Sequence, residues 1–184
     1  MNDRELLHQL RTGDTAAVEA LYRAHFQGLC AFAARITGSA SAGEEIAEEV
    51  IVRVWERRET LAVRTSLRAY LFGAVRRQAL LRLRDSKNRA RLLETAAADG
   101  MSPATAGAPL PPDEALDAAR LAGALRTAIA ALPDRAREAF TLKRAHGLSQ
   151  AEIADAMEIS ESTVEKHLAR AMDGLRTALA DWRR

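Results

Sequence analysis

The stretch 147–172, GLSQAEIADAMEISESTVEKHLARAM, carries the pattern of two short helices joined by a tight turn. Ser149 and Glu152 match the S-x-x-E capping box that begins a helix, and Ser160 is placed to cap a second helix. Apolar residues recur at helical spacing, so each helix would have one inward face. These inward positions are Ile153, Ala154 and Met157, then Ile159 in the turn, then Val164, Leu168 and Ala171. The stretch therefore predicts a helix-turn-helix.

The other face of the second helix is polar, and a helix-turn-helix presents this face to the DNA major groove. Its members are Glu161, Ser162, Thr163, Glu165, Lys166, His167 and Arg170. One residue in the turn fits less easily, because Glu158 occupies a position that is often glycine. If the backbone there has a positive φ, glutamate costs roughly 1 kcal/mol relative to glycine.

Composition limits the class of fold and the location. Of the 184 residues, 48% are hydrophobic and only 4% are aromatic, which favours an all-α fold with a buried core. The single cysteine, Cys30, excludes an internal disulfide and a zinc site made of several thiolates. No apolar run is long enough to span a membrane, and the start MNDRELLHQL lacks the features of a signal peptide. We therefore expect a soluble, cytoplasmic protein without direct membrane insertion.

The chain divides into two helical blocks, residues 1–94 and 113–184, with a linker between them at 95–112. The linker, TAAADGMSPATAGAPLPP, holds four of the five prolines and almost no charge. Such a segment cannot continue a helix and has little to bury. The expected architecture is two small helical domains, the second of which contains the helix-turn-helix.

Apolar spacing in the first block predicts three or four helices, three of them over 15–36, 44–58 and 66–91, with SASAG as a loop before the second of these. The second helix would begin with four acids, Glu44, Glu45, Glu48 and Glu49. These acids suit the positive end of a helix dipole, and they would equally suit a surface for a partner protein. The inward face of the third helix would comprise Leu67, Tyr70, Leu71, Ala74, Val75 and Leu81.

Positive charge collects on the third helix and just before it. Residues 64–91 hold nine cations and one anion, a local balance of +8 in a chain whose total is +2. Each cation that meets a phosphate releases counterions, so this segment predicts salt-dependent nucleic-acid binding. The residues expected to contact DNA are Arg64, Arg68, Arg76, Arg77, Arg82, Arg84 and Lys87. Residues 143–184 hold seven cations and seven anions, so the helix-turn-helix would bind DNA weakly by charge alone.

Patterns typical of catalysis or metal binding are weak. Glu5 and His8 form one E-x-x-H unit, whereas a di-iron bundle needs two such units and further glutamates. No G-x-x-x-x-G-K-[ST] phosphate loop is present. His25 and Cys30 do not share a helical face, and Cys30 is most simply a small core residue. We expect no catalytic residues, no metal site and no cofactor.

Two segments, in this order, resemble a known family. GEEIAEEVIVRVWERRETL followed by SLRAYLFGAVRRQALLRLRDSKNR is similar to the −10-binding domain of bacterial sigma-70-type factors. ALPDRAREAFTLKRAHGLSQAEIADAMEISESTVEKHLARAMDGLRTAL is similar to their −35-binding domain. The length, the two blocks and the linker match the small extracytoplasmic-function (ECF) subgroup. Within that subgroup, STVEKHLARAM resembles the iron-starvation type.

The resemblance implies roles for particular residues. The helix over 45–58 would dock on core RNA polymerase through Glu48, Glu49, Val52, Arg53 and Trp55. The loop 59–65 and the basic helix would bind the −10 element and hold the melted strand, with Tyr70 and Phe72 as the available aromatics. Tyr70 would equally fit the core. The residues that would read −35 base edges are Glu161, Ser162, Thr163, Lys166 and His167, while Arg170 would reach a phosphate.

These roles together imply a sigma factor that binds core polymerase, recognises −35 and −10 promoter elements and promotes initiation, without catalysing a reaction. Its partners would be core RNA polymerase, promoter DNA and an anti-sigma factor, which is membrane-anchored in the iron-starvation type. The alternative is a helix-turn-helix regulator that binds an operator without polymerase. The linker would permit both an extended form and a compact, inhibited form in which the DNA-binding faces are hidden.

Overall fold

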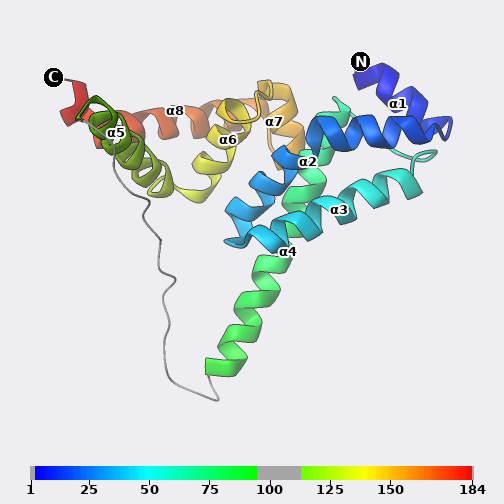
Figure 1. The fold of residues 1–184 in the computed structure, drawn as a ribbon, viewed down its shortest axis with the longest axis horizontal. Coiled ribbons are helices and arrows are strands. Elements are labelled where there is room, and N and C mark those ends of the chain that lie inside the picture. The colour runs from blue at the N-terminus through cyan, green and yellow to red at the C-terminus, as the bar shows by residue number, and fades with distance from the viewer. Residues whose placement is uncertain (1–2, 95–112, 184) are drawn as a thin grey trace.

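The computed structural model describes residues 3–94 and 113–183, and every element in this part of the chain is helical (Figure 1). The all-α prediction is confirmed, whereas the linker predicted at 95–112 lies outside the described residues. The first block contains α1 Asp3–Arg11, α2 Thr15–Thr37, α3 Ala40–Glu56 and α4 Leu67–Glu94. The second block contains α5 Asp113–Ala130, α6 Asp134–Arg144, α7 Gln150–Met157, α8 Glu161–Ala178 and a 3-10 turn, Ala180–Arg183.

Helix α2 begins and ends where its capping residues predict. The Asp14 carboxylate accepts the Ala16 N–H at 2.9 Å, which satisfies one of the free donors of the first turn. At the other end Gly38 adopts a φ of 76° and donates its N–H to the Ala34 carbonyl at 2.8 Å. Glycine reaches this left-handed conformation without the steric cost of a side chain, so the helix stops there.

The loop predicted at SASAG is wrong, because α3 begins at Ala40. The Ser39 hydroxyl accepts the Ala42 N–H at 3.3 Å and caps the helix one turn earlier than expected. Gly43 lies inside α3, where an added Cβ would sit 2.6 Å from the Cys30 carbonyl oxygen. The glycine is therefore needed for the close approach of α3 to α2. Since the first turn of α3 contains no acid, the four glutamates that follow do not serve the helix dipole.

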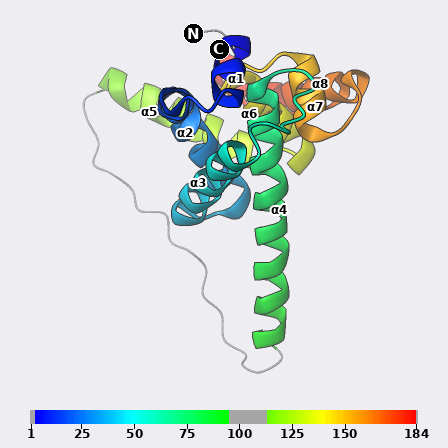
Figure 2. The same cartoon turned by 90° about the vertical axis from the view of Figure 1, so that its right-hand side faces the viewer.

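Helix α4 begins at the predicted cap, since the Ser66 hydroxyl accepts the Ala69 N–H at 3.0 Å. Its inward face is shorter than predicted. Burial continues as far as Ala79, whereas Leu81 is 47% exposed. The C-terminal half of α4 extends away from the other helices (Figure 2).

The helix-turn-helix prediction is confirmed in detail. Ser149 and Glu152 form the full capping box at the start of α7, and Ser160 caps α8 by accepting the Thr163 N–H at 3.3 Å. Val164 and Ala171 are fully buried on the inner side of α8. Glu158 ends α7 with a φ of 57°, which is the only positive φ among the non-glycine residues described. The suspected cost of about 1 kcal/mol relative to glycine therefore applies.

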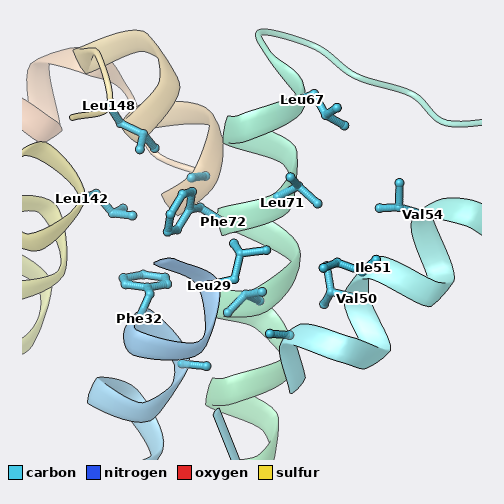
Figure 3. Packing of buried hydrophobic residues seen from close by; sticks show 14 of the residues in the cluster. Leu29, Phe32, Val50, Ile51, Val54, Leu67, Leu71, Phe72, Leu142 and Leu148 are labelled. Carbon is cyan, nitrogen blue, oxygen red and sulfur yellow. The ribbon is translucent and has the colours of Figure 1, made fainter. Parts of the chain in front are cut away.

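One large hydrophobic core is shared by the two blocks. Figure 3 shows Phe72 of α4 pointing toward Leu142 and Leu148 of the second block, with Phe32 of α2 beside it. On the opposite side of α4, residues such as Leu71 face α3. A second, smaller cluster joins α5, α6 and α8 through Ala128, Leu132, Ala136, Ala171 and Leu175. The predicted division into two domains remains a prediction, since the main core crosses it.

Candidate nucleic-acid and polymerase interfaces

The predicted −35 residues all lie on α8, at its start and along its outer side. Glu161, Ser162, Lys166 and Arg170 are exposed, and Thr163 and His167 are half-buried. The hydroxyls at the start of the helix form a small network, in which Ser160 Oγ lies 3.0 Å from Ser162 Oγ and 2.8 Å from Thr163 Oγ1. The outer face of α8 is open to solvent, as a helix that enters a DNA groove requires.

The predicted −10 cations fall into three groups. Arg64 and Lys87 are exposed, Arg84 is exposed with its Nε 3.7 Å from Asp85 Oδ1, and Arg68 is half-buried. Arg77 and Arg82 are exposed but form ion pairs, Arg77 Nη1 with Glu158 Oε1 at 2.8 Å and Arg82 with Glu45. Arg76 is different, because it is only 5% exposed. Residues 64–91 therefore do not present a single uniform basic surface.

Arg76 lies between the two blocks. Its Nε donates to Glu138 Oε2 of α6 at 2.8 Å, and its Nη2 is buried without a hydrogen-bond partner. In this arrangement its guanidinium is not accessible to a DNA phosphate, which corrects the expectation from charge alone. A signal was present in the sequence, since Phe72, Val75, Arg76 and Ala79 follow the i, i+3, i+4, i+7 spacing of one helical face.

The two aromatics predicted to hold a melted strand are placed differently. Phe72 is 3% exposed and packs edge-on against Phe32, with ring centroids 5.5 Å apart. It is therefore a core residue here and is not available for base stacking. Tyr70 is half-buried against the core and also lines a surface cavity of about 410 Å³ beside Arg64 and Arg77. Tyr70 is therefore partly a core residue, and its contact with a melted strand remains a prediction.

His146 was not singled out from the sequence, yet it lies at the centre of the contact between the blocks. Its ring centroid is 4.6 Å from that of Phe72 and 5.9 Å from that of Phe32. Burial, and then the nearby cations Arg68 and Arg35, lower the pKa of His146 to about 4. The imidazole is therefore neutral at physiological pH. A lone histidine in a loop carries no periodic signal that would have placed it there.

The predicted polymerase-docking residues gather on the outer face of α3. Glu48, Glu49, Val52 and Arg53 line a shallow hollow of about 550 Å³, and Val52 is 53% exposed. Arg53 is held by Glu49 at 2.6 Å and by Gln78 of α4 at 3.2 Å. Glu48 and Glu49 therefore lie on the side of α3 and not at its N-terminus, and the docking role of this surface remains a prediction.

Trp55, the fifth docking residue, is half-buried and packs partly on the core. The Arg58 guanidinium lies over its ring, 4.5 Å from the centroid, which is a cation–π geometry. Cys30, expected to be a small core residue, is half-buried against the core. Burial, and then the charge of Glu44, raise the pKa of its thiol.

A cleft of about 910 Å³ lies between the blocks. Its floor is apolar, with Phe32, Leu80 and Ile129 from three helices. Its lining cations are Arg35, Arg76, Lys87, Arg126, Arg135 and Arg137, and its acids are Asp134 and Glu138. Neither a group of three potential metal ligands nor a helix capable of crossing a membrane occurs within 3–94 and 113–183.

Comparison with known proteins identifies the family. A family model described as Sigma-70 region 2 matches residues 21–89, and one described as Sigma-70, region 4 matches residues 122–173. The ECF RNA polymerase sigma factor SigL of Mycobacterium tuberculosis is 30% identical over 174 residues, which cover 91% of this chain and 92% of SigL.

Two solved structures show the same fold. CnrH in complex with the cytosolic domain of CnrY has a TM-score of 0.64 and 24% identity, and the match covers 99% of both chains. The sigma factor RpoE of Bartonella quintana, in complex with the anti-sigma factor NepR, also has a TM-score of 0.64, with 19% identity, and the match covers 88% of this chain and 96% of RpoE. With region 2 in the first block, region 4 in the second and SigL matched over nearly its full length, the chain belongs to the ECF sigma factors of the sigma-70 family.

Proposed function

We propose that this ECF sigma factor binds core RNA polymerase, directs it to promoters through −35 and −10 elements, and promotes initiation without catalysing a reaction itself. The observation that carries the proposal is the combination of three surfaces on one chain. The outer face of α8 is open, α4 carries a dense positive charge, and α3 presents an ordered charged hollow around Val52. A stand-alone operator-binding regulator has no need for the third surface.

The charge distribution supports different DNA-binding roles for the two blocks. We assign melted −10 DNA to the exposed cations of α4 and of the loop before it, mainly Arg84 and Lys87 of α4 and Arg64 of the loop in the free protein, because phosphates are bound largely by charge. The near-neutral second block would read the −35 duplex through α8. Tethering to polymerase raises the effective concentration of this block at the promoter, so weak intrinsic binding is sufficient.

Reconstituted transcription tests the proposal. Core RNA polymerase with this protein should give runoff transcripts from a library of genomic fragments, and core polymerase alone should not. Mobility shifts of the recovered fragments with the protein alone should be weak at physiological salt. Tight binding of a specific fragment without polymerase, together with no initiation in its presence, would favour the operator-binding alternative.

An anti-sigma factor is the further partner that we propose. Of the two solved structures with the same fold, CnrH is in complex with the cytosolic domain of CnrY, and RpoE is in complex with NepR, which is named as an anti-sigma factor. The cleft between the blocks, with its apolar floor and excess of arginine and lysine, would suit an acidic amphipathic helix. Membrane anchoring of that partner and the iron-starvation subtype remain hypotheses based on STVEKHLARAM alone, and the matched relatives do not support the subtype.

We further propose that residues 1–94 and 113–184 act as separate functional units during initiation, and that the protein works in the cytoplasm, where core polymerase is found. The first unit would carry the polymerase-docking residues and the −10 cations. The second would carry the −35 helix.

A further inference from the structure

None of the residues assigned to polymerase or to DNA lies on α1. This helix, Asp3–Arg11, also precedes residues 21–89, the part of the first block that matches Sigma-70 region 2. Its apolar side is fixed in the main core through Leu6 and Leu10, which are both buried. Two of its polar side chains, one from each end of the helix, contact the segment between Leu61 and the first turn of α4. Helix α1 is therefore joined to that segment as well as to the core.

The first contact fixes the middle of the loop 59–65, which passes beside α1 (Figure 1). Arg11 Nη2 donates a hydrogen bond to the Leu61 carbonyl oxygen at 3.0 Å. Leu61 lies outside the helices, so the guanidinium supplies the donor that a backbone acceptor requires. The Leu61 side chain is buried in the main core. The loop is therefore held at Leu61 through both its backbone and its side chain.

The second contact lies just after the loop, at the first turn of α4. Asp3 Oδ2 accepts the Arg68 N–H at 3.4 Å, and the Ser66 hydroxyl accepts the Ala69 N–H at 3.0 Å. The two acceptors thus satisfy neighbouring donors that have no partner within the helix. A carboxylate is also favoured at this end of a helix by the helix dipole. Through Asp3, α1 therefore supports the start of the basic helix as well as the loop before it.

The residues between these two contacts form an open surface. Ala62, Arg64 and Thr65 are exposed, and Val63 is half-buried. Ala62 and Arg64 line the cavity of about 410 Å³ together with Tyr70 of α4. This cavity therefore combines side chains from the loop and from α4, and its shape depends on the path that the loop takes to α4.

We propose that Arg11 and Asp3 are positioning residues for recognition of the −10 element, which hold the loop 59–65 in place relative to α4 and act through Leu61 and Arg68 without touching DNA. This inference rests on the proposed assignment of the loop to −10 DNA. A loop that is already ordered loses less conformational entropy when it binds a melted strand. Loss of either α1 contact should therefore weaken recognition of the −10 sequence and leave polymerase docking through the outer face of α3 unaffected.

Runoff transcription with core polymerase and the full-length protein tests this role at the promoter. The templates are a promoter recovered from the genomic library and versions of it with base substitutions at −10 or at −35. Discrimination, the ratio of transcript from the parent to transcript from a substituted promoter, does not depend on the fraction of folded protein. Arg11→Ala should lower discrimination at −10 about two- to tenfold, the range expected for one hydrogen bond, and leave discrimination at −35 unchanged.

Two further positions provide the controls. Arg23→Ala removes an exposed cation of α2 that pairs with Glu19 of the same helix, so it should change neither ratio. Asp3→Ala distinguishes position from charge, because loss of an acid would favour phosphate binding on every promoter, whereas loss of the contact with Arg68 should lower discrimination at −10. Asp3→Asn keeps an oxygen that can accept the Arg68 N–H, so its discrimination should stay within about twofold of wild type.

Limited proteolysis of the free protein tests the α1 contacts without polymerase. Trypsin cleavage after Arg64, followed by mass spectrometry of the fragments, reports how often the loop opens locally. Arg11→Ala should speed this cleavage about two- to tenfold, because one hydrogen bond that holds the loop is lost. Arg23→Ala should leave the cleavage rate unchanged.

The proposal is overturned if cleavage after Arg64 is unchanged in Arg11→Ala, if Arg11→Ala lowers discrimination at −10 and −35 equally or not at all, or if Asp3→Asn behaves like Asp3→Ala. Failure of the wild type to initiate would refute the proposed function, and with it the role of the loop at the promoter. Unchanged cleavage and discrimination in a protein that does initiate would refute the positioning role alone.

Discussion

The hydroxyl of Ser66 and the carboxylate of Glu152 join the N-terminal caps of two helices in different blocks. Ser66 Oγ donates to Glu152 Oε1 at 2.7 Å and accepts the Ala69 N–H, while Glu152 Oε2 accepts the Ser149 N–H at 2.8 Å. Burial alone would raise the pKa of Glu152, but the hydrogen bonds from Ser149 and Ser66 outweigh it and hold the pKa below its usual value.

Replacement of Glu152 should therefore weaken both a helix cap and the contact between the blocks. Glu152→Ala is expected to lower the free energy of unfolding at pH 7 by about 1 kcal/mol or more, the typical value of a cap. Because the folded pKa is depressed, this contribution is present at neutral pH and is lost as the pH falls below the ordinary carboxyl value of 4.5. Urea unfolding at neutral and acidic pH measures both effects. An Ala variant with wild-type stability at pH 7 would contradict the expectation.

The buried pair between Arg76 and Glu138 should be costly to break from one side. Glu138→Gln leaves the Arg76 guanidinium buried without an opposite charge beside it. We therefore expect the free energy of unfolding to fall by about 3 kcal/mol. The double variant Arg76→Met, Glu138→Leu removes both charges and should recover most of this loss. Glu19→Gln is the matched exposed control, since Glu19 and Arg23 are more than two-thirds accessible, and should change stability by less than about 0.5 kcal/mol. Chemical denaturation distinguishes these cases.

Glycine at position 158 should be more stable than alanine at the same position. Both variants lack the ion pair to Arg77, so their difference isolates the backbone effect of the positive φ. We expect Glu158→Gly to exceed Glu158→Ala by about 1 kcal/mol in the free energy of unfolding. Equal stability of the two variants would mean that the turn relaxes out of the left-handed conformation.

His146 should make the protein sensitive to mild acid. Its pKa is about 4 in the folded protein and near the ordinary 6.5 in the unfolded chain, so the unfolded chain takes up the proton first. Its contribution to stability is therefore full above pH 6.5 and is lost progressively down to about pH 4, with a slope of at most about 1.4 kcal/mol per pH unit. His146→Phe should reduce the pH dependence in this window. Urea midpoints across the window provide the measurement, and parallel curves for the two proteins would rule out the effect.

Variants of α8 and α4 should distinguish residues that read promoter bases from residues that bind phosphates. Lys166→Ala on the outer side of α8 should change the preferred −35 sequence. The expected loss is about 1–3 kcal/mol of discrimination between bases at the affected base pair. Arg84→Ala on α4 should weaken open-complex formation similarly on all promoters and lower the salt slope by about one. Runoff transcription on a randomised promoter library at several salt concentrations compares the two variants. If Lys166→Ala had the same effect on every −35 sequence, Lys166 would not contact base edges.

Much of the local structure could be predicted from the sequence, because helix caps and helix faces depend on residues that are close together in the chain. The capping box at Ser149, the second cap at Ser160 and the inward residues of α8 follow from spacing alone. The unusual backbone of Glu158 could be suspected for the same reason. The start of α3 was missed, since a run of alanine and serine suits both a loop and a helix, and the need for Gly43 arises only from the approach of α2.

The helix caps, the helix-turn-helix and the sign of the charge on each segment could be predicted because they depend on residues a few positions apart. Which side chains face another block rather than solvent depends on how the helices pack together. Arg76, a cation expected to contact DNA, pairs with Glu138 of α6, and Phe72, an aromatic expected to be available for stacking, packs against the ring of His146. Helical periodicity defines a face of a helix, but what covers that face depends on packing between segments far apart in the chain.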